Sequence, residues 1–280
     1  MFHEIINQAT EKYPFLIEHR NVKYIPHFHK ETEIVYVREG NLNITIENNS
    51  FEIKEGEICI ITPGLIHNLY SYENNMTFVM KLFPVIDISN IRLINSVVSF
   101  DSANYEPLKK YIFDMIYENK TKTIGYELSA NIIAEKIFLL IIRNMAYQQL
   151  EDTAQIKLAG KSDFLDSVTS YLEKYYTDNF TLEDVAKHLN YTKSYFCHYF
   201  KRITGVTFWK YYTIFRLEKC IQVMKKYPSK KYVEISEMSG FKNVRSFNQA
   251  FKEYHHCTPK EYMKKYYQLK EIDSTIDELE

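Results

Sequence analysis

The feature that most constrains this chain is a near-repeat close to its C-terminal end. Two segments carry similar side chains at nearly the same spacing: Asn190-Tyr191, Phe196 and Phe200-Lys201, then Gly240-Phe241, Phe247 and Phe251-Lys252. Each copy is typical of a short helix, a tight turn and a second helix, because asparagine and glycine best tolerate the positive φ of such a turn. Two helix-turn-helix units can read two stretches of DNA major groove. The repeat therefore predicts a sequence-specific DNA-binding protein.

The second helix of each predicted unit has a buried face and an exposed face. In the first unit Phe196, Phe200 and Ile203 recur at i, i+4 and i+7, which is one side of a helix. The exposed faces carry the candidates for DNA contact: Ser194, Cys197, His198 and Lys201 in the first unit, and Arg245, Ser246, Asn248, Gln249 and Lys252 in the second. Arg, Asn and Gln can make paired hydrogen bonds to base edges. Plain helical hairpins with polar outer faces are the alternative, and the tandem repetition favours DNA binding.

The charge distribution suits a polyanionic partner for only one part of the chain. With 280 residues, 45% of them hydrophobic and 25% charged, the chain can form two folded domains. Its net charge of −1 hides an asymmetry, because residues 163–268 hold 18 Lys and Arg against 11 Asp and Glu. The remainder holds 17 against 25. The basic segment suits double-stranded DNA, although an ordinary solvated surface would also explain it.

The N-terminal part has the pattern of a β domain. Apolar and polar side chains alternate over 42–46 and 51–53, and turn residues such as Gly40, Gly56 and Pro63-Gly64 lie between such runs. Short strands at regular spacing over 22–83 predict a small antiparallel barrel or jelly roll. Helical periodicity follows over 105–119 and 126–150. The predicted fold class is therefore a β-barrel followed by helices, and then an all-α domain with two helix-turn-helix units.

Four segments follow from these patterns. Residues 1–150 form the barrel and dimerisation domain, 151–162 lose periodicity and form a linker, 163–268 bind DNA, and 269–280 form an acidic tail. Within the first domain, Ile132–Met145 is too apolar for a solvated helix. We expect it to be covered by a second subunit of a homodimer, with Ile137 and Ile141 as the residues to test, or by its own barrel.

A group of polar residues marks a candidate site inside the barrel. His27, His29 and Glu33 share parity along a strand, so all three can point inward, and Pro63-Gly64 can turn the chain to present His67. The spacing H-x-H-x₃-E-x₆-G resembles the first motif of the cupin proteins, and Pro63–His67 is similar to the second. We expect these four side chains to bind a polar effector such as a sugar. A divalent metal on the same four residues and a filled core are the alternatives.

Residues 163–268 resemble the AraC/XylS family of bacterial transcription regulators. The resemblance rests on Phe200-Lys201-Arg202-Ile203-Thr204-Gly205, on Arg216-Leu217-Glu218-Lys219-Cys220, and on Gly240-Phe241, Phe247, Phe251-Lys252, Thr258-Pro259 and Tyr262. It implies a cupin-like effector domain, a homodimer, and contact with RNA polymerase if the protein is an activator. The family often has Arg where this chain has His198 and Gln249. We therefore expect the first recognition helix to supply less direct readout than the second.

Other classes of function find less support in the sequence. A metal-dependent cupin enzyme fused to a DNA-binding module is the main alternative, but no independent acid/base pair stands out, so we expect no enzyme activity and no cofactor. An activator without an effector is another alternative. The four cysteines are scattered, which suits reduced thiols. No signal peptide or membrane-spanning run is visible, so we expect a cytoplasmic protein.

Overall fold

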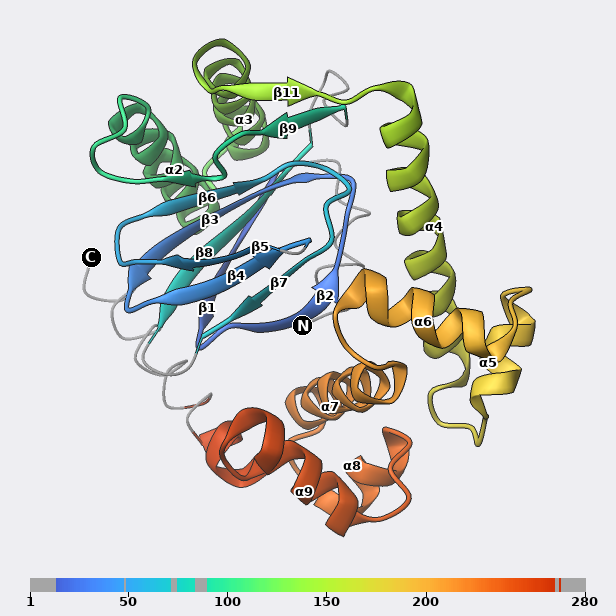
Figure 1. The fold of residues 1–280 in the computed structure, drawn as a ribbon. Helices are drawn as coiled ribbons and strands as arrows, with labels where there is room; N and C mark the ends of the chain where they lie inside the picture. The colour runs from blue at the N-terminus through green and yellow to red at the C-terminus, as the bar shows by residue number, and fades with distance from the viewer. Residues whose placement is uncertain (1–13, 48, 72–74, 84–89, 265–266, 268–280) are drawn as a thin grey trace. The chain divides into compact units, whose positions relative to one another are not determined.

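The computed structural model describes residues 14–47, 49–71, 75–83, 90–264 and 267 (Figure 1). Contacts within the chain divide it into two compact units, one built mainly from residues up to Asp166 and the other mainly from Ser167 onward. The predicted acidic tail, 269–280, lies outside the described residues. The boundaries that we predicted for the domains stay a prediction.

The N-terminal unit is built around two larger antiparallel sheets, as the sequence predicted for a β domain. The larger sheet has the strand order β1 (Phe15–Arg20), β8 (Met76–Leu82), β3 (Thr32–Glu39), β6 (Ile58–Ile61) and β10 (Val97–Val98). The smaller sheet has the order β2 (Lys23–His27), β7 (His67–Tyr70), β4 (Leu42–Ile46) and β5 (Asn49–Ile53). Gly40, Gly56 and Gly64 adopt positive φ at the predicted turns. The alternation of β4 is also confirmed, because Leu42, Ile44 and Ile46 are buried.

The central strand β3 is buried on both faces, for two different reasons. Ile34 and Tyr36 pack in an apolar core with the helices α2 (Tyr105–Thr121) and α3 (Tyr126–Asn144). Glu33 lies on the opposite face, where it meets His67 of the smaller sheet. The strand thus separates a dry core beneath the helices from a polar site between the sheets.

The helix expected over 126–150 ends earlier than predicted. Met145 is extended, with φ −100° and ψ 139°, and Tyr147–Gln149 form the strand β11, which pairs with β9 (Ile91–Leu93). The buried face of α3 is covered by its own domain, since Ile137 and Ile141 belong to the core that contains Ile34. The choice of these two isoleucines as dimer contacts was therefore wrong. The homodimer itself stays a prediction.

The segment expected to be an aperiodic linker is also regular. Residues 152–162 form the first part of the helix α4 (Asp152–Tyr175). Most side chains described there are exposed, so no apolar period marks the helix in the sequence. Lys161 pairs with Glu47 at 2.9 Å, which ties this part of α4 to the turn between β4 and β5.

The C-terminal unit contains the two predicted helix-turn-helix units (Figure 1). The helices are α5 (Leu182–His188) and α6 (Lys193–Thr204), the connecting helix α7 (Phe208–Lys226), and α8 (Tyr232–Met238) and α9 (Val244–His255). Thr181 and Asp184 form the expected capping box at α5. Asn190 and Gly240 have φ of 59° and 76° at the two turns. None of the described helices is long and apolar enough to cross a membrane.

Candidate DNA-reading helices and barrel site

The helix α6 presents parallel stripes of different chemistry. Phe196, Phe200 and Ile203 are buried, at 0%, 0% and 8% exposure. Each helical residue turns by about 100°, so residues two positions earlier lie on the opposite side. Those residues are Ser194, His198 and Lys201, and all three are exposed, while Cys197 is half-buried. The structure therefore groups the predicted contact residues of α6 on one outer face.

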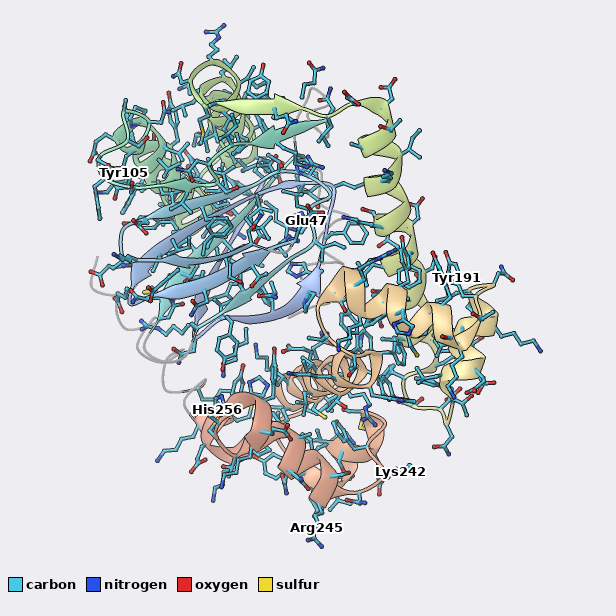
Figure 2. The ribbon with its side chains drawn as sticks, viewed as in Figure 1. Glu47, Tyr105, Tyr191, Lys242, Arg245 and His256 are labelled. Carbon is cyan, nitrogen blue, oxygen red and sulfur yellow. The ribbon has the colours of Figure 1, made fainter. Side chains whose placement is uncertain are left out.

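The helix α9 repeats this arrangement with different outer residues. Phe247 and Phe251 are fully buried, whereas Arg245, Gln249 and Lys252 occupy the opposite side and are exposed, as is Asn248. Figure 2 shows Arg245 projecting outward at the end of the unit. Ser246 Oγ donates to the carbonyl of Asn243 at 2.8 Å, so its hydroxyl proton is already used within the helix. Roles for these side chains in binding stay predictions.

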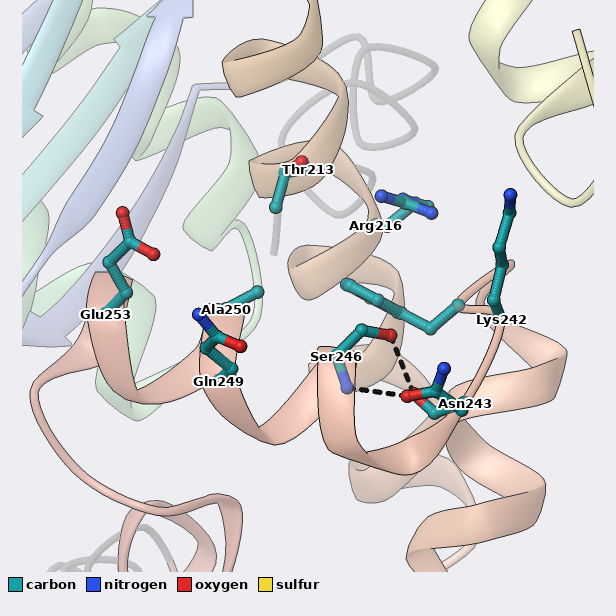
Figure 3. A pocket seen from close by; sticks show the side chains of 9 residues that line it. Thr213, Arg216, Lys242, Asn243, Ser246, Gln249, Ala250 and Glu253 are labelled. Atoms are coloured by element: carbon teal, nitrogen blue, oxygen red, sulfur yellow. Dashed lines mark hydrogen bonds between the residues drawn. The ribbon is translucent and has the colours of Figure 1, made fainter.

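A groove of about 390 Å³ runs beside α9 (Figure 3). Its lining comprises Thr213, Arg216, Phe241, Lys242, Asn243, Ser246, Gln249, Ala250 and Glu253. Asn243 caps α9, because its Oδ1 accepts the amide of Ser246 at 2.8 Å (Figure 3). Gln249 is exposed on the outer side of α9 and also lines this groove.

Arg216 and Gly240 fix the second unit on its connecting helix. The Arg216 guanidinium lies 4.2 Å from the ring centre of Tyr212 and 4.3 Å from that of Phe241, and it donates to the carbonyl of Gly240 at 2.8 Å. A Cβ on Gly240 would lie 2.3 Å from the carbonyl oxygen of Tyr176. The second turn therefore needs glycine for space as well as for φ.

In the N-terminal unit, the four predicted polar residues do converge. His27 ends β2, His29 lies in the following loop, Glu33 is in β3 and His67 begins β7. One ligand atom from each lies within 4.8 Å of all the others. His29 Nε2 is 3.0 Å from Glu33 Oε2, and His67 Nε2 is 3.5 Å from Glu33 Oε1. The amide of Gly64 donates to the carbonyl of His29 at 2.9 Å, which holds the two loops together.

The imidazole rings of His29 and His67 each lie between a backbone carbonyl and the Glu33 carboxyl. His29 Nδ1 lies 3.0 Å from the carbonyl of Glu31, and His67 Nδ1 lies 2.8 Å from that of Leu65. A neutral imidazole has one N–H, so a ring that donates to its backbone carbonyl turns a lone pair toward Glu33. Burial lowers the pKa of His29, which favours the neutral ring. The tautomer of each ring therefore decides whether it turns an N–H or a lone pair toward Glu33.

The two neighbouring histidines favour the ionised form of the Glu33 carboxyl. Burial opposes its ionisation, but His67 and His29 outweigh that effect and hold its pKa well below the usual range. Glu33 Oε1 and His67 Nε2 have no hydrogen-bond partner among the residues that the structure describes. Buried acceptors without donors are costly, at about 1–3 kcal/mol each. The arrangement suits a bound group that brings donors or positive charge.

One charged residue beside this cluster was missed in the sequence. Lys81 is 2% exposed and lies directly across from Glu33 in the pairing of β8 with β3. Burial lowers the pKa of its ammonium group, while Glu33 and Glu31 act in the opposite direction. The sequence shows that Lys81 alternates in step with Thr77 and Val79 and so shares one face of the strand with them. Which residue lies across from Lys81 depends on the pairing register of the sheet, which the sequence does not show.

Both halves of the chain match known protein families. An AraC-like ligand binding domain matches residues 13–88, and a helix-turn-helix domain matches residues 185–265. The chain belongs to the AraC family of transcription regulators. It therefore has a ligand-binding domain and a DNA-binding domain.

Individual relatives of this AraC-family chain are distant. It is 24% identical to the uncharacterized HTH-type transcriptional regulator YdeC of Bacillus subtilis, over 94% of each chain. It is 22% identical to the Msm operon regulatory protein of Streptococcus mutans, over 88% of each. The structure of unsaturated fatty acid bound ToxT from Vibrio cholerae aligns with a TM-score of 0.56 at 15% identity, over 90% of this chain and 95% of that one. That likeness shows a shared fold.

Proposed function

We propose that this AraC-family regulator binds double-stranded DNA through α6 and α9 and is controlled by a small polar effector in its barrel. The observation that carries the second half is the cluster of His27, His29, Glu33 and His67, whose ligand atoms lie within 4.8 Å of one another. A bound effector would shift the population between states with different DNA affinity. Lys201, Arg245 and Gln249 are the principal candidates for contact with DNA.

The chemistry of the cluster supports an effector rich in hydroxyl groups, such as a sugar. Glu33 Oε1 and His67 Nε2 are buried acceptors, and a hydroxyl of the effector can donate to each. Lys81 can donate to an oxygen of the same molecule. ToxT is described with a bound fatty acid, whereas the polar cluster here supports a polar ligand.

A divalent metal is the second candidate for this site. Three imidazoles and one carboxylate are a donor set that zinc, iron, manganese, nickel or copper accepts. His29 and His67 each have a backbone carbonyl beside Nδ1, which can fix the tautomer that leaves Nε2 for a metal. A cation would also relieve the contact between His29 Nε2 and the Glu33 carboxylate.

One preparation of the full-length protein separates these candidates. Elemental analysis without added metal comes first, followed by thermal unfolding with sugars and metabolites before and after chelation. A sugar effector predicts a raised melting temperature that survives chelation and is lost in Glu33→Gln. A metal predicts stoichiometric occupancy and a melting temperature that falls on chelation. If no compound or metal shifts unfolding, and Glu33→Gln leaves regulation intact, control by this site is excluded.

We also propose that two copies associate through the outer face of α3. Leu128, Ile132 and Leu139 lie on that face and are 67%, 48% and 47% exposed. This is a row of exposed apolar side chains at helical spacing. Leu128→Glu and Leu139→Glu should lower the mass measured by light scattering without loss of folding. Wild-type protein that is monomeric at high concentration, with and without DNA, would contradict the dimer.

If the protein is an activator, RNA polymerase is a further partner.

A further inference from the structure

Three tyrosines form a continuous stack that begins two residues before α6 and continues along one side of it. The ring centres of Tyr191 and Tyr195 are 5.1 Å apart, those of Tyr195 and Tyr199 are 5.4 Å apart, and both pairs are close to parallel, at 24° and 20°. The guanidinium of Arg202 lies 5.0 Å from the ring centre of Tyr199 and extends the row. We call Tyr191, Tyr195, Tyr199 and Arg202 the tyrosine row. Figure 2 marks Tyr191 at its beginning.

The tyrosine row borders the outer face that is predicted to enter the major groove. Tyr195, Tyr199 and Arg202 each precede a buried residue by one position, namely Phe196, Phe200 and Ile203. One position corresponds to about 100° around the helix. Ser194, His198 and Lys201 come one position earlier again. The tyrosine row therefore lies between the buried stripe and the outer stripe of α6. If α6 enters the major groove of DNA, the row would face the sugar-phosphate backbone at the edge of that groove.

The row is not required by the helix-turn-helix fold. The same positions in α9, one before Phe247, Phe251 and Tyr254, hold Ser246, Ala250 and Glu253. The second unit buries its phenylalanines fully with these small or acidic residues beside them. Tyr191 and Tyr195 remain 37% and 49% exposed, so stacking alone does not remove them from water. The row is a surface feature of the first unit.

We propose that the tyrosine row binds the sugar-phosphate backbone of one DNA strand beside the groove that α6 enters. Phenol hydroxyls donate to phosphate oxygens, a contact that fixes position without reading sequence. Stacking already restricts the side-chain torsions of these tyrosines, so they lose little conformational entropy when they bind. Charge identifies the occupant, because α6 carries Lys193, Lys201 and Arg202 and no acidic residue. The proposal rests on DNA binding by the two helix-turn-helix units.

This contact would give the two units different tasks. The first unit has few side chains suited to paired hydrogen bonds with bases, and it has the row. The second unit has Arg245 and Gln249 on its outer face and, where the row would be, the groove of Figure 3. On this view α6 anchors the protein on the backbone and α9 supplies most of the base readout.

Tyr195→Phe tests the proposal, because it removes one hydroxyl and keeps the stacked ring. Tyr227→Phe, at an exposed tyrosine elsewhere in the unit, is the matched control. Fluorescence anisotropy of the full-length protein measures Kd for a selected operator and for random duplex. We expect Tyr195→Phe to weaken both by a similar factor, about 3- to 10-fold, and the control to weaken neither. Ethylation of the phosphate that Tyr195 contacts should interfere less with binding of Tyr195→Phe than with wild-type binding, whereas interference at the other phosphates facing α6 should persist.

Other results would overturn the proposal. A changed sequence preference in Tyr195→Phe would mean that the row reads bases. Unchanged Kd values for Tyr195→Phe and for Tyr195→Ala, with transcription lost in cells, would mean that the row binds a protein. Unfolding curves that match wild type show that any loss of affinity is not a loss of folding. Wild-type protein that binds no duplex would contradict the proposed function itself, which is a separate result from failure of the row.

Discussion

In both recognition helices, two phenylalanines four residues apart are fully buried, yet the residues around them differ. Beside Phe196 and Phe200 lie two stacked tyrosines, and beside Phe247 and Phe251 lie Ser246, Ala250 and a groove. The fold thus demands the buried pair and leaves the neighbouring stripes open to other uses. A difference between two copies of one scaffold is easier to attribute to function than a feature of either copy alone, because packing is held constant.

The turns of the two units differ in the same way. Both need positive φ, which Asn190 supplies in the first unit and Gly240 in the second. Only Gly240 also has a backbone atom in the space of a Cβ, at 2.3 Å from the Tyr176 oxygen. Asparagine is thus tolerated where the turn faces open space, and glycine is required where the end of α4 passes the turn.

The largest expected effect is on folding. Gly240→Ala should destabilise the C-terminal unit by about 3 kcal/mol or more, because the left-handed conformation costs roughly 1–2 kcal/mol and the clash with the Tyr176 carbonyl adds to it. Gly205→Ala is the matched control, with φ +73° and nothing within 4 Å of its Cβ. Gly205→Ala should lower the free energy of unfolding only by the roughly 1–2 kcal/mol of the left-handed conformation. Chemical denaturation followed by circular dichroism measures both, and equal losses would show that the turn relaxes and that space is not the constraint.

The second effect concerns base readout. Arg245→Ala and Gln249→Ala should each cost about 1–3 kcal/mol of binding to the selected operator and relax the preference at defined base pairs. Ser194→Ala and His198→Ala, at equivalent outer positions of α6, should change the preference much less. Selection of bound sequences from a random pool gives the result directly. If the variants of α6 altered the selected sequence as strongly as those of α9, the two helices would share the reading equally.

Much of this comparison could be predicted from the sequence, because the spacing of residues within a short window indicates local structure. The buried phenylalanines, the turn residues and the convergence of His27, His29, Glu33 and His67 all follow patterns within short windows. Features set by distant pairing were missed. Tyr147–Gln149 becomes a strand because it pairs with Ile91–Leu93, far earlier in the chain. Lys81 faces Glu33 because of sheet register.

The remaining misses come from surfaces without an apolar period. Most side chains described over residues 152–162 of α4 are exposed, and an exposed stretch of helix leaves no hydrophobic repeat in the sequence. The tyrosine row was missed for another reason. Tyr195 and Tyr199 adjoin Phe196 and Phe200, so in the sequence they are part of one aromatic run, and only the side-chain positions separate the core from the surface.

The smallest effect concerns phosphate contacts and would sharpen the distinction between anchoring and reading. Lys201→Ala should weaken binding to all sequences alike and reduce the slope of log Kd against log salt by about 0.9, the value for one phosphate neutralised. Lys252 holds the equivalent place in α9, next to Glu253, which lowers the local positive potential. Lys252→Ala should therefore change the slope less. Titration of duplex at several salt concentrations gives both slopes. A larger change for Lys252→Ala than for Lys201→Ala would place the main backbone contact on α9 and contradict the division of tasks, whereas the reverse order would support α6 as the anchor.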